Sequence, residues 1–130
     1  MIHCYDVVSV EDDQLLFSLM ADALAGPPIA LRHARTGAQG LELLTQANPN
    51  LLLLDISLPD MRGWELLDRA AAQGILTCGR VIVLTSHAEI QHRIIGKLND
   101  VIAYMNKPFT PFELQDKVRG ELGLARPAQA

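Results

Sequence analysis

Leu51-Leu52-Leu53-Leu54-Asp55 is the stretch that decides the fold. Its four leucines form a short apolar run with Asn48-Pro49-Asn50 before it and a loop containing Pro59 and Gly63 after it. A run of this length without polar alternation is typical of a strand buried on both faces of a parallel sheet. Asp55 ends the run, and a carboxylate at the end of such a strand needs a chemical reason.

Short apolar strands alternate with helices on both sides of this stretch. Apolar residues recur at helical spacing between the strands, and Gly and Pro mark most boundaries. We expect strands at 5–10, 29–34, 51–54, 80–84 and 101–105, and helices at 14–24, 38–46, 64–73, 88–98 and 111–122. Strict alternation predicts an α/β fold with a doubly wound, five-stranded parallel sheet, because each right-handed crossover returns the chain in the same direction.

Length and composition predict one domain. The chain has 130 residues, of which 49% are hydrophobic and 20% charged, enough to bury a core. We expect this domain to occupy residues 1–124. The remaining 125–130 contain Arg126-Pro127 and have no apolar periodicity, so we expect a short flexible tail.

Charge and hydropathy exclude several classes of partner. The net charge is −4 and no run of Lys or Arg occurs, which argues against direct nucleic-acid binding. The same acidic balance, and an apolar run far too short to cross a bilayer, argue against a membrane protein. Without a secretory signal pattern the expected location is the cytoplasm, where Cys4 and Cys78 are expected to be thiols.

Polar residues follow the expected strands at one edge of the sheet. Glu11 and Asp12 follow the first strand, Asp55 the third, Thr85 the fourth and Lys107 the fifth. These carboxyl ends meet in one crevice, where three carboxylates would raise each other's pKa unless a cation neutralised them. Oxygen ligands without His or Cys favour Mg²⁺.

The same residues could handle a phosphoryl group. Lys107 offers a point charge for a phosphoryl oxygen and Thr85 offers a hydroxyl donor. Asp55 can act as a nucleophile toward phosphorus, as carboxylates do in aspartyl-phosphates. We expect Asp13 to be a solvated acid at a helix N-terminus and Asp60 to be a loop acid rather than a ligand.

The chain resembles a bacterial response-regulator receiver domain, of two-component or phosphorelay signalling, over about residues 5–122. Five motifs occur in the right order, and together they are far more specific than any one alone. They are Val10-Glu11-Asp12-Asp13, the stretch Leu54-Asp55-Ile56-Ser57-Leu58-Pro59-Asp60-Met61-Arg62-Gly63, then Leu84-Thr85-Ser86, Tyr104, and Lys107-Pro108-Phe109.

The resemblance implies a flavodoxin-like (βα)5 fold with strand order 2-1-3-4-5, and phosphorylation of Asp55 by a histidine kinase or phosphotransfer protein. It implies that Asp12, Asp55 and the backbone carbonyl of Ser57 ligate Mg²⁺, with Glu11 acting through metal-bound water. The only catalysis implied is that of its own Mg²⁺-dependent phosphorylation and dephosphorylation.

The resemblance also implies a switch. Thr85 would move toward the phosphoryl group and Tyr104 would turn inward, changing the face made by the fourth and fifth helices and the fifth strand. A downstream protein would bind that face, and the chain would be a monomer or a weak phosphorylation-dependent dimer. Ser57 and His87 occupy the positions that tune dephosphorylation.

Three alternative functions compete with this interpretation. A phosphatase of the haloacid-dehalogenase type would need a second acid two residues after Asp55, where Ser57 stands. A receiver-like interaction module without phosphorylation is disfavoured by the full set of site residues. A receiver fragment of a larger transcriptional regulator stays open.

Overall fold

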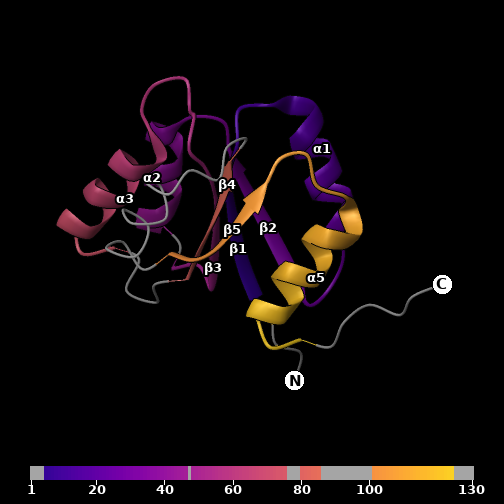
Figure 1. Ribbon diagram of the computed structural model, residues 1–130. Helices are drawn as coiled ribbons and strands as arrows, with labels where there is room; N and C mark the ends of the chain where they lie inside the picture. Colours follow the sequence, from indigo (N-terminus) through magenta and orange to yellow (C-terminus); the bar gives the residue numbers. More distant parts are fainter. Residues whose placement is uncertain (1–4, 47, 76–79, 86–100, 125–130) are drawn as a thin grey trace.

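A five-stranded parallel sheet forms the centre of the protein, as the sequence predicts. The computed structural model describes residues 5–46, 48–75, 80–85 and 101–124. The strands lie in the order β2-β1-β3-β4-β5, and all neighbours pair in parallel (Figure 1). They are β1 (Tyr5–Val10), β2 (Ile29–Ala34), β3 (Leu51–Asp55), β4 (Val81–Thr85) and β5 (Val101–Asn106).

The direction of winding reverses between β1 and β3. The chain passes from β1 to β2 on one side and then returns to place β3 on the other side of β1. Val10 pairs with Leu54, and Asp55 pairs with Leu84. The carboxyl ends of the three central strands therefore meet at one edge, the topological switch point where doubly wound folds bind their ligands.

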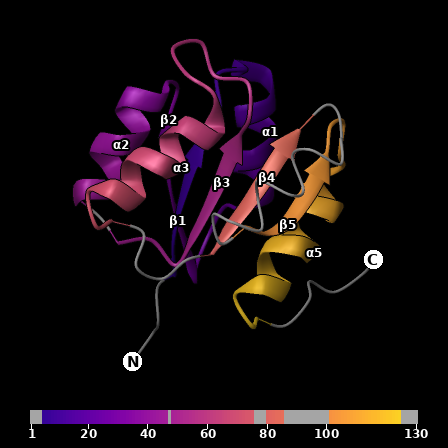
Figure 2. The same cartoon turned by 60° about the vertical axis from the view of Figure 1, so that its left-hand side comes forward.

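The helices form two layers, one on each face of the sheet. α1 (Gln14–Ala23) and α5 (Pro111–Glu121) cover one face, and α2 (Gly37–Gln46) and α3 (Gly63–Ala72) cover the other (Figures 1 and 2). Every described element agrees with its predicted bounds to within one residue at each end. The helix predicted at 88–98 lies outside the described residues.

β3 is buried on both faces, which explains its unbroken run of leucines. Leu51 and Leu53 pack in the core beneath α1 and α5, whereas Leu52 and Leu54 pack beneath α2 and α3. All four are 0% exposed, and burying one Leu side chain contributes roughly 1.5–3 kcal/mol. The strand that carries Asp55 is thus held from both sides.

Local capping fixes where α1 and α5 begin. Asp13 Oδ1 accepts hydrogen bonds from the N–H groups of Leu15 and Leu16, so this acid is the N-cap of α1. Thr110 and Glu113 form a reciprocal capping box at the start of α5. Among the helices that the structure describes, none is long and apolar enough to cross a membrane.

Candidate functional site

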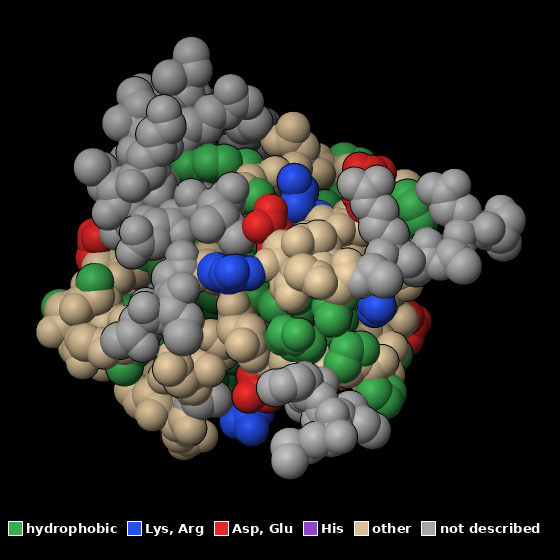
Figure 3. All heavy atoms as spheres, turned by 90° about the horizontal axis from the view of Figure 1, so that it is seen from below, with side chains coloured by type: hydrophobic (Ala, Val, Ile, Leu, Met, Phe, Trp, Pro, Cys, Tyr) green, Lys and Arg blue, Asp and Glu red, His purple; other side chains and the backbone are tan. Residues whose placement is uncertain are grey.

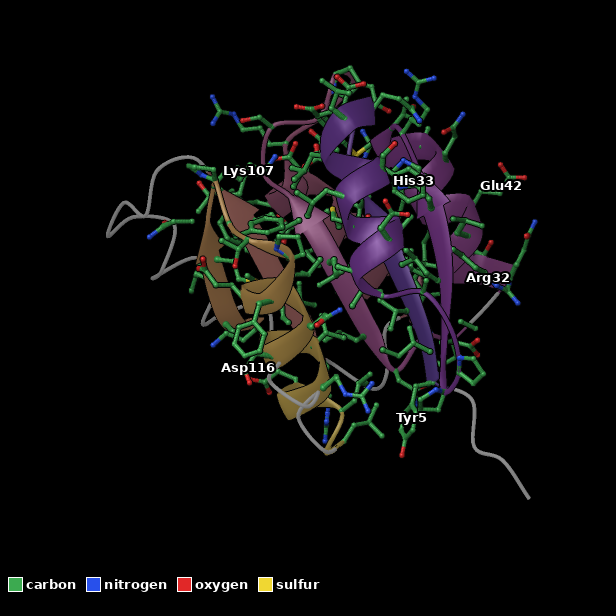
Figure 4. All side chains as sticks on the ribbon, turned by 90° about the vertical axis from the view of Figure 1, so that its right-hand side faces the viewer. Tyr5, Arg32, His33, Glu42, Lys107 and Asp116 are labelled. Carbon is green, nitrogen blue, oxygen red and sulfur yellow. The ribbon has the colours of Figure 1, made fainter. Side chains whose placement is uncertain are left out.

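Asp55, Glu11 and Lys107 come together at the switch point. Lys107 Nζ lies 2.5 Å from Glu11 Oε1 and 3.4 Å from Asp55 Oδ2. Glu11 is 1% and Asp55 6% exposed, so both carboxylates are buried. Figure 4 shows Lys107 at the carboxyl end of β5, the strand at the edge of the sheet. Three elements far apart in sequence therefore build one charged cluster.

The backbone of the sheet places these side chains. Glu11 N–H donates to Ala34 O at 3.0 Å, which continues the β1–β2 pairing one residue past the strand. Lys107 N–H donates to Thr85 O at 2.7 Å, which continues the β4–β5 pairing in the same way. A cis peptide bond follows between Lys107 and Pro108. The main chain thus fixes both partners of the 2.5 Å ion pair.

The cluster carries more negative than positive charge. Burial is the main cause of the raised pKa of Glu11, and the hydrogen bond with Asp55 raises it further, while Lys107 opposes both. Counting Asp12, the next residue in the chain, the site contains three carboxylates and one ammonium. The formal charge of these four groups is −2, which matches the charge of one divalent cation.

The carboxylate oxygens of Glu11, Asp12 and Asp55 suit a hard cation, but the three acids differ in burial. Asp12 is exposed, in contrast to buried Glu11 and Asp55. Among the described residues, no group of three or more His, Cys, Asp and Glu side chains is arranged to hold a metal ion. What the structure does bring together is a buried pair of carboxylates with oxygen donors, the kind of ligand that Mg²⁺ prefers.

Ser57 lies directly beside Asp55 at the surface of the protein. Its backbone N–H donates to Asp55 Oδ1 at 3.1 Å, and the residue is exposed. The loop that carries it closes where Gly63 N–H donates to Ile56 O at 2.8 Å. A Cβ at Gly63 would stand 2.9 Å from Asp55 O, so glycine permits the close approach of the α3 N-terminus to the end of β3.

The other predicted residues lie nearby or outside the described part of the chain. Thr85 ends β4, is 4% exposed and pairs with Asn106. Tyr104 lies on β5, is partly buried and packs against the core beneath α2 and α3. It also lines a shallow surface hollow of about 370 Å³, together with Pro108, Asp116 and Lys117 among others. His87 lies outside the described residues.

The amino ends of the strands lie at the opposite end of the sheet from this site, and their surroundings carry no buried acid pair among the described residues. A hollow of about 390 Å³ is lined there by Tyr5, Asn50, Arg80 and Leu122. Figure 3, viewed from below, shows apolar side chains on this side with charges of both signs scattered around them. The buried acid pair thus belongs to the carboxyl edge of the strands.

Sequence reasoning missed the role of Asp60, which was expected to be only a loop acid. Its two carboxylate oxygens accept the N–H groups of Gly37 and Ala38 at the start of α2, at 2.8 and 2.9 Å. A partner 23 residues away leaves no trace in local sequence patterns. The one available signal was Gly37, a residue without a side chain where a helix begins.

Fold and site together define a doubly wound α/β protein with a buried acidic cluster at its switch point. The family model for the response regulator receiver domain matches residues 7–119. The chain therefore belongs to the response regulator receiver domain family, whose members are signalling domains of two-component systems rather than typical enzymes. This confirms the resemblance seen in the sequence.

Curated relatives include transcriptional regulators. The probable transcriptional regulatory protein SilR of Salmonella typhimurium is 33% identical over 115 residues, which cover 87% of this chain and 49% of SilR. The transcriptional regulatory protein TrcR of Mycobacterium tuberculosis is 32% identical over 126 residues, which cover 94% of this chain and 48% of TrcR. The chain thus spans about half the length of these relatives.

Solved receiver structures agree with the fold. A CheY-like response regulator receiver domain protein from Methanospirillum hungatei JF-1 superposes with a TM-score of 0.82 at 29% identity, covering 92% of this chain and 94% of its own. The signal receiver domain of a putative Luxo repressor protein from Vibrio parahaemolyticus gives a TM-score of 0.83 at 27% identity, covering 92% and 91%. Both similarities extend over nearly the whole of each chain.

Proposed function

We propose that Asp55 accepts a phosphoryl group from a histidine kinase or phosphotransfer protein, and that the modified chain then binds a downstream protein. The observation that carries this proposal is the setting of Asp55. Its carboxylate is buried at the switch point, with the Ser57 N–H 3.1 Å from Oδ1 and the Lys107 ammonium 3.4 Å from Oδ2. Family membership adds independent support.

The transfer balances with groups at the site. A carboxylate oxygen of Asp55 attacks phosphorus, an O–P bond forms, the N–P bond of the donor phosphohistidine breaks, and its electron pair returns to the imidazole. Lys107 is close enough to Asp55 to neutralise a phosphoryl oxygen without a large movement of its stem. Thr85, at the end of the next strand, supplies a hydroxyl donor.

Asp12, Asp55 and the Ser57 carbonyl would hold Mg²⁺, with Glu11 acting through water. Bound there, the ion would supply positive charge to the transferring phosphoryl oxygens. The formal charge of −2 on Glu11, Asp12, Asp55 and Lys107 supports this assignment. So does the raised pKa of Glu11, whose causes include the neighbouring Asp55.

The proposed output surface is the side of β5 and α5. Thr85 O accepts from Lys107 N–H, so the end of β4 is joined directly to the residue that follows β5. Tyr104 stands three residues before Lys107 on this segment and lines the hollow beside α5. Phosphorylation would thereby change the surface offered to a protein partner.

A second candidate is that this chain acts as the receiver part of a longer transcriptional regulator. The relatives named above are transcriptional regulatory proteins, and this chain matches about half of each. Reading the gene in frame beyond codon 130 tests this candidate. A DNA-binding segment there would favour it, whereas a stop codon would favour a protein partner in trans.

The phosphorylation test is intact-mass measurement after incubation with acetyl phosphate and Mg²⁺. Wild type should gain one phosphoryl group only when Mg²⁺ is present, and Asp55→Asn should gain none. Asp68→Asn, which removes an exposed acid of α3, serves as a control and should still be labelled. Continued single labelling of Asp55→Asn would show that the acceptor is another residue.

A further inference from the structure

We propose that Asp60 is a positioning residue that fastens residues 56–62, here called the acceptor loop, to the N-terminus of α2. Through this attachment it holds Ser57, whose N–H contacts Asp55 and whose carbonyl is the proposed metal ligand. The inference rests on the proposed function for its consequence. The fastening itself follows from contacts that do not depend on phosphorylation.

The polar half of the attachment is a two-point contact. Gly37 N–H donates to Asp60 Oδ1 at 2.8 Å and Ala38 N–H donates to Oδ2 at 2.9 Å. These are the first two N–H groups of α2, which have no acceptor within their own helix. Both hydrogen bonds lower the pKa of Asp60, the Gly37 bond being the largest cause, so the carboxylate stays ionised at neutral pH.

The apolar half places Met61 directly on Gly37. A Cβ at Gly37 would stand 2.4 Å from Met61 Cγ and 2.6 Å from Met61 Sδ, well inside van der Waals contact. Gly37 is itself buried, and Met61 packs against the core beneath α2 and α3. The loop tip and the helix start are therefore in contact through both their polar and their apolar groups.

The base of the acceptor loop is closed separately. Gly63 N–H donates to Ile56 O, and Ser57 forms an antiparallel bridge with Arg62. The tip would otherwise project from this base into solvent, because Pro59 and Asp60 are exposed. Tying the tip to α2 leaves the Ser57 carbonyl few alternative positions. Residues that orient a metal ligand without touching the metal commonly change the metal affinity of a site.

Helix capping alone does not account for Asp60, because α2 also has a local cap. Thr36 Oγ1 accepts from Gln39 N–H at 3.1 Å, and Gln39 Oε1 accepts from Arg35 N–H at 3.0 Å. These bonds span only three and four residues and tie the helix start to itself. The Asp60 bonds reach across 23 and 22 residues and tie it to the loop. Thr36→Ala is therefore a matched control that weakens the same helix end without releasing the loop.

The experiment compares wild type, Asp60→Ala and Thr36→Ala in the full chain. Backbone hydrogen exchange across 56–63 is measured without Mg²⁺, and Mg²⁺ affinity is measured by the fluorescence of Trp64, the chain's single tryptophan. Asp60→Ala should speed exchange in the acceptor loop about tenfold and weaken Mg²⁺ binding about tenfold. Thr36→Ala should lower the melting temperature by about 4 °C and change neither quantity.

Gly37→Ala provides a second variant that attacks the apolar half. Its methyl group should displace Met61 and speed exchange in the acceptor loop while leaving the Asp60 carboxylate in place. Unchanged loop exchange and unchanged Mg²⁺ affinity in Asp60→Ala, with the thermal loss seen in Thr36→Ala, would reduce Asp60 to a helix cap. A wild type that takes up no phosphoryl group would contradict the proposed function, while faster loop exchange in Asp60→Ala would still support the fastening.

Discussion

Lys107 Nζ lies 2.5 Å from Glu11 Oε1, closer than the 3.4 Å that separates it from Asp55 Oδ2. The ammonium is thus paired most tightly with the acid that is least able to reach water, since the Glu11 side chain is 1% exposed. Asp55 shares the same cation at longer range. One lysine therefore links the stability of the buried acid to the charge around the proposed phosphoacceptor.

Replacing Lys107 by Met should destabilise the fold. The change leaves Glu11 buried beside Asp55 without its cation, and breaking a buried pair in this way costs about 3–5 kcal/mol. Because the Lys107 side chain is 19% exposed, we expect a smaller loss, of about 2 kcal/mol in the free energy of unfolding at pH 7. Urea unfolding measures it.

The matched control is the double variant Lys107→Met with Glu11→Gln. Removing both charges removes the uncompensated carboxylate, so the double variant should be more stable than Lys107→Met alone. If the two single losses simply add, the ion pair carries no coupling energy and the interpretation of Glu11 as the main partner of Lys107 is wrong.

Mg²⁺ should stabilise wild type, and Asp55→Asn should reduce this effect strongly. At a Mg²⁺ concentration about 100 times its dissociation constant, ligand linkage adds about 2.7 kcal/mol to the free energy of unfolding. Without Mg²⁺, Asp55→Asn should be the more stable protein, because it removes one of two buried carboxylates that share Lys107. Thermal unfolding in EDTA and in Mg²⁺ checks both statements.

NaCl at the same ionic strength controls for general screening by salt. Equal stabilisation of wild type and Asp55→Asn by Mg²⁺ would place the ion elsewhere on the acidic surface. A lower stability of Asp55→Asn in EDTA would contradict the excess of negative charge inferred for the cluster.

Gly63→Ala should disturb Asp55 without removing any functional group. Its Cβ would stand 2.9 Å from Asp55 O and 3.1 Å from Ile56 Cα, both backbone atoms that cannot rotate away. We expect a loss of about 1–3 kcal/mol in the free energy of unfolding, as for other overpacked sites. Phosphoryl uptake from acetyl phosphate should also slow.

Gly120→Ala is the control for the same chemical change. Gly120 lies on α5 and a Cβ there would meet no atom within 4 Å. Alanine at this position should stabilise the protein by about 0.5–1 kcal/mol through helix propensity, with phosphoryl uptake unchanged. A Gly63→Ala variant as stable and as active as this control would show that α3 can shift away from Asp55 at little cost.

Much of the fold could be predicted because its signals are local. The leucine run ending at Asp55 predicted a buried strand, and alternating periodicity placed every described element to within one residue. The site followed from the same pattern, since parallel strands bring the residues after their ends together. Glu11, Asp55 and Lys107 are indeed in contact, although the sequence predicted that Lys107 serves a phosphoryl oxygen and gave no sign of its pairing with Glu11.

The features that escaped prediction depend on contacts between distant segments. Asp60 is indistinguishable from an ordinary loop acid until α2 is seen to begin beside it. His33 of β2 stacks on Phe17 of α1, with ring centroids 3.6 Å apart and an interplanar angle of 15°. Local periodicity describes which face a residue occupies, but not which side chain of another element it meets.

His33 should make the protein less stable as the pH falls. The ring lies on β2 beside α1 (Figure 4), both of its nitrogens are shielded from solvent, and burial lowers its pKa below the ordinary value of 6.5. Glu11 and the Ser9 backbone oppose this shift and Arg35 assists it, all to a smaller extent than burial. A lowered folded-state pKa means that the unfolded chain takes up the proton first.

The stabilising contribution of neutral His33 is therefore complete above about pH 6.5 and is lost as the pH falls toward the folded-state pKa. We expect His33→Phe, which keeps the stack on Phe17 and cannot be protonated, to lose less free energy of unfolding than wild type between pH 7.5 and about 5. Urea unfolding at several pH values measures both curves, and their difference gives the contribution of His33 together with its coupling to Glu11. Parallel curves would mean that His33 titrates normally, which would contradict its burial as the cause of the shift.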